Sequence, residues 1–214
     1  MTPRALSELA DLVLVVEGMR AARPRASGRL IVGLVGAPGA GKSTIAAALS
    51  AELPDSVVLP MDGFHLPQAE LVRLGRRDRM GAPDTFDVDA FVALLTDLRS
   101  GAGSGRRMLA PGFDRRVEEP VPGAIELLPE RATVVVEGNY LLLPRDGWQR
   151  VSPLLDLSVG IVLDDDTRHE RLIARHIAFG KAPDAARAWA LGPDERNAAA
   201  IAATLDRADY LLEG

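Results

Sequence analysis

The sequence predicts a three-layer α/β sandwich, in which helices cover both faces of a mostly parallel sheet of five strands. Apolar runs with the composition of strands alternate along the chain with segments whose apolar spacing is helical. Two runs, residues 132–138 and 157–163, are apolar almost throughout, as in strands buried on both faces of a parallel sheet. A glycine-rich segment, residues 36–41, joins the first run to a helical pattern, which is a further mark of this fold class.

The elements are expected in the following order. The strands are residues 30–35, 56–61, 132–138, 157–163 and 209–212, and the helices are residues 4–22, 44–49, 67–74, 87–98, 166–179 and 194–207. Residues 1–28 are expected to form an N-terminal helix packed on the main domain, residues 29–214. The run Gly101-Ala102-Gly103-Ser104-Gly105 predicts a flexible loop inside that domain, because strands on both sides of it are needed for one sheet.

Composition narrows the function classes. Acidic residues number 30 and basic ones 25, and the net charge of −5 argues against a nucleic-acid-coating surface. Cysteine is absent, which excludes disulfides, thiolate metal sites and a cysteine nucleophile. No apolar run reaches the roughly 18 residues of a membrane span, and the N-terminus lacks a signal-peptide pattern. A cytoplasmic protein is therefore expected, with no membrane partner.

The segment from Gly36 to Ser43 matches the phosphate-binding pattern G-x-x-x-x-G-K-[ST] between a strand and a helix. Backbone N–H groups of such a loop surround phosphate oxygens, and glycines allow the close approach. Lys42 supplies a cation for the β- and γ-phosphates, and the Ser43 hydroxyl can ligate Mg²⁺. ATP is expected to contact Gly36, Ala37, Pro38, Gly39, Ala40, Gly41, Lys42, Ser43 and Thr44.

Two carboxylates end the strands expected beside this loop. Glu137 closes an apolar strand and could hold Mg²⁺ directly or through water; the alternative is a strand-terminal side chain in solvent. Asp62 follows the strand at residues 56–61 and could accept a proton from an attacking hydroxyl; the alternative is a turn residue of an Asp-Gly pair. Since ligands gather at the carboxyl ends of parallel strands, both acids should face one crevice with the glycine loop.

A basic helix after the fourth strand predicts a lid over residues 166–182. Arg168, Arg171 and Arg175 have the spacing of one helix face, and such cations can stabilise a transferred phosphoryl group while the lid excludes water. A solvated basic face is the alternative interpretation. The acids at residues 164–166 are interpreted as an N-cap. His176 is interpreted as a surface residue, and contact with a ligand is the alternative.

These motifs come in one order along the chain: the glycine loop, Asp62-Gly63-Phe64-His65, residues 81–87 with Pro83-Asp84-Thr85-Phe86-Asp87, Glu137-Gly138-Asn139-Tyr140 and the helix around Arg171. Together they resemble the P-loop kinases of the phosphoribulokinase, uridine kinase and pantothenate kinase superfamily, nearest to a bacterial nucleoside kinase-like or fructose kinase-like branch. The likeness covers about residues 30–212.

The resemblance implies a P-loop NTPase fold with a basic helical lid and an active site with residues in named roles. Asp62 would be the catalytic base, assisted by Lys42, Arg171 and Arg175, with Ser43 and Glu137 at the metal. Asp84 would grip acceptor hydroxyls, or alternatively cap the helix near Asp87. The expected acceptor-binding residues are Asp62, His65, Asp84, Phe113, Asp114, Arg115, Glu137, Tyr140 and Arg168.

The function expected from residues and resemblance is transfer of the γ-phosphate of ATP to a hydroxyl of a small polyol, a nucleoside or sugar, as in uridine kinases. The open alternatives are a pantothenate kinase-like enzyme, a sugar-phosphate kinase that uses an arginine among residues 73–79, and an ATP-sensing module. A GTPase is disfavoured because no Asn-Lys-x-Asp motif is present. Oligomeric state stays open, and a homodimer is compatible with the sequence.

Overall fold

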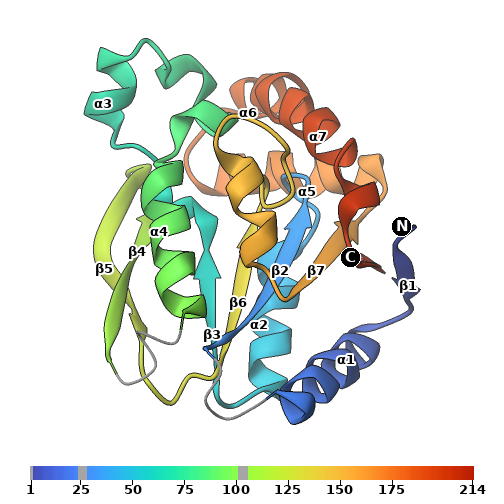
Figure 1. Ribbon diagram of the computed structural model, residues 1–214. Coiled ribbons are helices and arrows are strands. Elements are labelled where there is room, and N and C mark those ends of the chain that lie inside the picture. The colour runs from blue at the N-terminus through green and yellow to red at the C-terminus, as the bar shows by residue number, and fades with distance from the viewer. Residues whose placement is uncertain (1, 24–27, 101–105) are drawn as a thin grey trace.

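The structure of the protein is a computed structural model that describes residues 2–23, 28–100 and 106–214 (Figure 1). Its strands are β1 (Arg4–Leu6), β2 (Leu30–Gly36), β3 (Ser56–Pro60), β4 (Met108–Asp114), β5 (Glu119–Leu127), β6 (Thr133–Gly138), β7 (Leu157–Val162) and β8 (Tyr210–Glu213). Its helices are α1 (Leu9–Ala22), α2 (Lys42–Glu52), α3 (Gln68–Arg73), α4 (Val88–Arg99), α5 (Asp165–Ala178), α6 (Pro183–Trp189) and α7 (Glu195–Ala202). The loop expected at residues 101–105 lies outside the described residues.

The main sheet is wholly parallel, with strand order β1-β8-β7-β2-β6-β3. The predicted α/β class is confirmed, and all five predicted strands are present in the sheet. The sheet has a sixth strand as well, so the predicted count of five was wrong. Residues 4–6 form a sixth strand paired with Tyr210–Leu212, and the first helix begins only at Leu9. The Asp11 carboxylate accepts hydrogen bonds from the backbone N–H groups of Ser7 and Glu8, which fixes this helix start.

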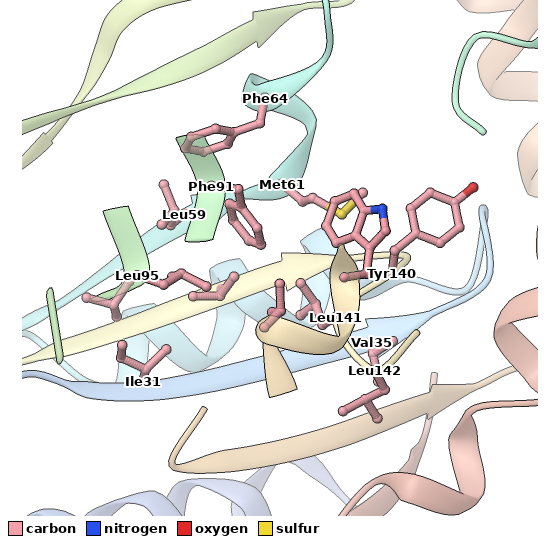
Figure 2. Packing of buried hydrophobic residues seen from close by; sticks show 14 of the residues in the cluster. Ile31, Val35, Leu59, Met61, Phe64, Phe91, Leu95, Tyr140, Leu141 and Leu142 are labelled. Atoms are coloured by element: carbon pink, nitrogen blue, oxygen red, sulfur yellow. The ribbon is translucent and has the colours of Figure 1, made fainter. Parts of the chain in front are cut away.

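Helices cover both faces of the sheet, and each face has its own apolar core. On one face α1 and α2 pack through Leu12, Val16 and Leu49. On the other face lie α4, the segment around residues 140–154 and α7. Figure 2 shows side chains of this second core, where the rings of Phe64 and Phe91 pack edge to face with centroids 4.9 Å apart.

A separate antiparallel hairpin, β4–β5, stands beside the turn that follows β3 and was not predicted. The turn, Met61–Phe64, is a single 3₁₀ turn that carries Asp62. Gly63 lies so close to the hairpin that a Cβ atom on it would come within 2.1 Å of the Pro111 carbonyl oxygen. This backbone-to-backbone contact fixes where the hairpin stands relative to Asp62.

The layer after β7 begins with α5, whose predicted N-cap is confirmed: the Asp164 carboxylate accepts from the Thr167 N–H at 2.8 Å. Further along the chain, helix α6 runs directly into a π-helical turn at Ala190–Asp194. This π-helical turn then runs directly into α7. The helix predicted over residues 194–207 is shorter than expected and ends at Ala202. Among the described residues, no helix has the length and apolar character needed to cross a membrane.

We expect Gly63→Ala to lower the free energy of unfolding by about 1–3 kcal/mol, because the new methyl group must push the hairpin backbone away. Urea denaturation of both proteins measures the change. Gly18→Ala is the matched control: nothing lies within 4 Å of its Cβ position on α1, so helix propensity alone should stabilise it by about 0.5–1 kcal/mol. Equal stability of the Gly63 variant and the wild type would contradict the close contact.

Candidate active site

The glycine loop connects β2 to α2 at the carboxyl edge of the sheet. Gly39 and Gly41 adopt φ values of 85° and 93°, in the left-handed region that favours glycine. Lys42 is the first residue of α2, and its ammonium donates hydrogen bonds to the carbonyl oxygens of Gly36 (2.9 Å) and Ala37 (3.0 Å). Burial lowers the pKa of Lys42 to about 8, although the nearby carboxylates of Glu137 and Asp62 act to raise it.

Glu137 lies at the end of β6, in the middle of the sheet. In the register it stands opposite Leu34 of β2 and Pro60 of β3. The Ser43 hydroxyl donates to Glu137 Oε1 at 3.0 Å, so a hydroxyl and a carboxylate lie side by side at the loop. Burial, aided by the negative charge of Asp62, raises the pKa of Glu137. Oxygen donors of this kind are the ligands that Mg²⁺ takes, so this pair fits a Mg²⁺ site.

Asp62 follows β3, the strand next to β6, so the two acids lie at the ends of neighbouring strands as predicted. The Arg115 guanidinium donates from Nη2 to Asp62 Oδ2 at 2.6 Å. Burial acts to raise the pKa of Asp62, but Arg115, with help from His65 and Lys42, holds it below its ordinary value. Asp62 therefore stays ionised while Glu137 is driven toward the neutral form.

His65 packs between two phenylalanine rings beside Asp62. Its ring centroid lies 3.9 Å from that of Phe86 and 4.7 Å from that of Phe113. Its Nδ1 lies 2.9 Å from the Asp62 carbonyl oxygen, which orients the ring. Burial lowers the pKa of His65 below its ordinary value, so the neutral imidazole is favoured at neutral pH.

Two hollows meet at these residues. An outer groove of about 510 Å³ follows the glycine loop and is lined by Gly41, Lys42, Ser43, Thr44 and Arg171 among others. A second hollow of about 130 Å³, called the inner cavity below, adjoins it and is lined by Asp62, His65, Phe113, Gly81 and Asn197 among others. Three residues line both and form the shared wall between the groove and the cavity: Arg115, Arg175 and Phe179.

The arginines of α5 do not share one role. Arg171 and Arg175 face the outer groove, and neither side chain has an ion pair with any residue that the structure describes. Burial lowers the pKa of Arg175, as does the positive charge of Arg115. Arg168 is only 2% exposed and lines neither hollow, because its guanidinium is bound by Asp165 (2.9 Å) and Glu195 (2.5 Å). The expectation that it binds the acceptor has no geometric support.

Four other predicted acceptor residues also lie outside the inner cavity: Glu137, described above, and Asp84, Asp114 and Tyr140. The Asp84 carboxylate is paired with Arg79 (2.6 Å) and Arg76 (3.3 Å). Asp114 accepts from the Arg116 N–H at 2.8 Å and borders an open groove on the hairpin. Tyr140 is fully buried, and its hydroxyl donates to the carbonyl oxygen of Gly81 at 2.5 Å, so it supports the cavity wall from behind.

Several cavity residues were missed by the sequence reasoning. His176, interpreted as a surface residue, lines the inner cavity and lies with Nε2 2.7 Å from Asp194 Oδ2. Asn197 lines it too and donates to the Gly81 carbonyl oxygen at 3.3 Å. Glu118, at the tip of the hairpin, faces Arg77 and Lys181. The one available signal was position: His176 is next to Arg175 on the helix predicted to be the lid.

The fold and the glycine loop define a P-loop protein that binds nucleoside triphosphates, and comparisons with known proteins narrow this class. No family model matches the chain. A crystal structure described as a "putative fructose transport system kinase" from Silicibacter sp. TM1040 is 38% identical, with a TM-score of 0.84 over 98% of this chain and 100% of that one. "Putative uridine kinase C227.14" of Schizosaccharomyces pombe is 32% identical over 162 residues, which are 71% of this chain and 68% of that protein.

A pantothenate kinase of Rhodopseudomonas palustris is 33% identical over 161 residues, or 70% of this chain, but the match spans only 50% of that longer protein. The chain belongs to the P-loop kinase family that includes the uridine and pantothenate kinases. It is a phosphotransferase with an alcohol group as acceptor.

We expect Arg115→Gln to raise the pKa of Asp62. Burial acts to raise this pKa, and the positive charge of Arg115 is the largest of the influences that lower it. Carboxyl ¹³C NMR of aspartate-labelled protein, with Asp62 assigned from Asp62→Asn, measures the titration. In the wild type, stability contributed by ionised Asp62 is present above the unfolded pKa of about 3.9 and is lost as pH falls through the lower folded value. Arg116→Gln, one residue along and exposed, is the control and should leave Asp62 unchanged. An unshifted Asp62 in Arg115→Gln would contradict this electrostatic account.

Proposed function

We propose that the protein transfers the γ-phosphate of ATP to a hydroxyl of a small uncharged polyol, a nucleoside or a sugar. One observation carries the proposal: Asp62, ionised and paired with Arg115, lines the inner cavity, and Arg115 also lines the groove of the glycine loop. A carboxylate placed there can receive a proton from a hydroxyl in the cavity and hold its oxygen toward a phosphate in the groove.

The donor side is assigned to the outer groove. The backbone of Gly36, Ala37, Pro38, Gly39, Ala40, Gly41 and Thr44 would surround the phosphates of ATP together with Lys42 and Ser43. Lys42, Arg171 and Arg175 would offset the negative charge on the transferred group. Ser43 and Glu137 would hold Mg²⁺, which neutralises phosphate charge when bound.

The transfer step follows from the same geometry. The acceptor hydroxyl gives its proton to the Asp62 carboxylate, its oxygen forms a bond to the γ-phosphorus, and the bond from that phosphorus to the β–γ bridging oxygen breaks to release ADP. Arg115 keeps Asp62 ionised and so ready to accept the proton. Because phosphoryl transfer needs little basicity, orientation of the hydroxyl is the main contribution of Asp62.

The charges around the inner cavity favour an uncharged acceptor. Its carboxylates already have partners: Asp62 pairs with Arg115, Glu118 pairs with Arg77, and Asp194 lies 2.7 Å from Nε2 of His176. The Asp62–Arg115 pair offers hydrogen bonds to hydroxyl groups, whereas an anionic acceptor would need a cation of its own. Arg175 lines the cavity without an ion pair among the described residues, but we assign it to the transferred phosphoryl group.

The arginines that a sugar-phosphate kinase would require are also engaged. Arg73 pairs with Glu70, Arg76 and Arg79 pair with Asp84, and Arg77 pairs with Glu118. Relatives named for uridine and for fructose, both uncharged, agree with this assignment. The anionic alternatives, pantothenate and a sugar phosphate, are therefore second choices. Among the predicted acceptor residues, Asp62, His65, Phe113 and Arg115 are the ones that we retain as direct contacts.

A panel of acceptors tests the proposed function. With Mg²⁺ and ATP, we expect ADP release to rise with an uncharged nucleoside, ketose or other polyol, and to stay at its basal level with pantothenate and sugar phosphates. A coupled assay for ADP measures the rates. Stimulation by an anionic acceptor alone would overturn the charge argument. ATP binding by calorimetry with no stimulation by any acceptor would favour the ATP-sensing module.

The role of Asp62 is tested by substitution. We expect Asp62→Asn to lower kcat by about 10²–10⁴-fold, the range for loss of a general base, while ATP still binds in calorimetry. Asp89→Asn is the matched control, because that carboxylate is exposed and pairs with Arg150 away from both hollows. Full acceptor-dependent activity in Asp62→Asn would show that another group positions the hydroxyl.

A further inference from the structure

Three segments around the inner cavity meet at Glu118. This residue ends the four-residue tip of the β4–β5 hairpin and lines the cavity. Its Oε2 lies 2.5 Å from Nη2 of Arg77, in the segment after α3, and its Oε1 lies 3.3 Å from Nζ of Lys181, at the end of the lid segment 166–182. One carboxylate thus joins the hairpin, the segment after α3 and the lid at the rim of the cavity.

The hairpin tip is held firmly on the side away from the lid. The Gln68 side-chain amide donates to the carbonyl oxygens of Val117 (2.6 Å) and Glu118 (3.3 Å), and Arg77 donates to Gln68 Oε1 at 3.0 Å. Glu118 itself has a φ of 53°, a left-handed conformation that non-glycine residues seldom adopt without a surrounding structure that holds them there. The hairpin tip is therefore held in one position, with the Glu118 carboxylate toward Lys181 of the lid segment.

The lid contributes an ammonium group that is held from two sides. Lys181 Nζ lies between the Glu118 carboxylate and the ring of Trp189 in α6, whose centroid is 5.0 Å away. Both members of the pair are about one-third exposed, with side-chain exposures of 27% for Lys181 and 34% for Glu118. A pair at this level of exposure is weak enough to break and re-form.

The size of the cavity shows why such a pair would have to break. Its volume is about 130 Å³, whereas sites that enclose organic ligands usually offer about 300–1,000 Å³. A nucleoside or sugar therefore needs more room at the rim than the cavity offers in this structure. Because the hairpin tip is bound to the segment after α3, we assign this widening to the lid. Among the described residues, the ion pair that joins the lid segment to the hairpin is Lys181–Glu118.

We propose that the Lys181–Glu118 ion pair is a latch that holds the lid against the hairpin and retains the acceptor in the inner cavity. Both are positioning residues, since they act through the closed arrangement of the lid and not on the reacting atoms. The retention of an acceptor rests on the proposed function, whereas the latch itself is a property of the fold and can be tested without a substrate.

The first test uses Trp189 as a reporter of lid closure. Trp148 is fully buried, so acrylamide quenching of the native fluorescence reports chiefly on Trp189, which is partly exposed. Glu118→Gln leaves Lys181 and Trp189 intact but removes the charge that holds them. We expect the open population to rise about two- to fivefold, the change for loss of a partly exposed ion pair, and quenching to rise with it. Glu126→Gln is the matched control, because it breaks a pair with Arg107 at the other end of the same hairpin.

The second test uses the acceptor identified by the panel. We expect Glu118→Gln and Lys181→Met each to raise the acceptor KM by about two- to fivefold, with kcat and the KM for ATP close to wild type. The double variant should lose little more than either single variant, because both remove the same contact. A purely structural role would instead lower the melting temperature and change kcat and both KM values together.

The outcomes separate the two proposals. Quenching of Glu118→Gln equal to that of the wild type and of Glu126→Gln would overturn the latch, as would KM effects that add in the double variant. If no acceptor is found but quenching rises only in Glu118→Gln, the latch stands and the proposed kinase substrate class fails.

Discussion

The site is organised around a buried ammonium group, that of Lys42, whose pKa the charges of two nearby carboxylates act to raise. Lys42 is held by carbonyl oxygens at the start of its own loop, and its positive charge is offset by Glu137 and Asp62 from the two neighbouring strands. Burying a lysine is unfavourable unless such partners are present. Here they come from the end of β6, which pairs with β2, and from the turn after β3, which pairs with β6. The order β2-β6-β3 is therefore a condition for a stable glycine loop as well as a feature of the fold. In the same arrangement the pKa of Asp62 is lowered and the pKa of Glu137 is raised. Asp62 therefore remains ionised while Glu137 is driven toward its neutral form.

The parts of the molecule that could be predicted from the sequence are those that local patterns define. The apolar strands, the glycine loop and the acids at the ends of β3 and β6 each occupy a few consecutive residues, and their meeting follows from the parallel sheet. Strand β1 was missed because its three residues, Arg4–Leu6, become a strand only through pairing with β8, some 200 residues later in the chain. Hairpin β4–β5 was missed because Pro120, Pro122 and Gly123 interrupt the alternation that marks a strand. The orientation of Arg168 depends on Glu195, 27 residues away, which no spacing rule reveals.

The difference between the two hollows has the same origin. The outer groove takes about half of its lining from the glycine loop and the start of α2, which a sequence pattern can name residue by residue. The inner cavity takes its walls from the turn after β3, the segment after α3, the hairpin and the lid, and each of these contributes only one or a few side chains. Asp84 illustrates the consequence: its motif was recognisable, yet Arg76 and Arg79 bind its carboxylate outside the cavity. Recognition of the acceptor therefore depends on contacts between distant segments.

Arg115 and Arg175 stand in the wall between the two hollows and line both of them. A negative charge that enters the groove draws on the same two guanidinium groups that face the cavity, and it changes the balance between Arg115 and Asp62. The occupancy of one hollow therefore alters the free energy of filling the other, and by thermodynamic linkage the effect is equal in both directions. Coupling between two ligands is thus built into a shared wall of three side chains, Arg115, Arg175 and Phe179, without any rearrangement of the sheet.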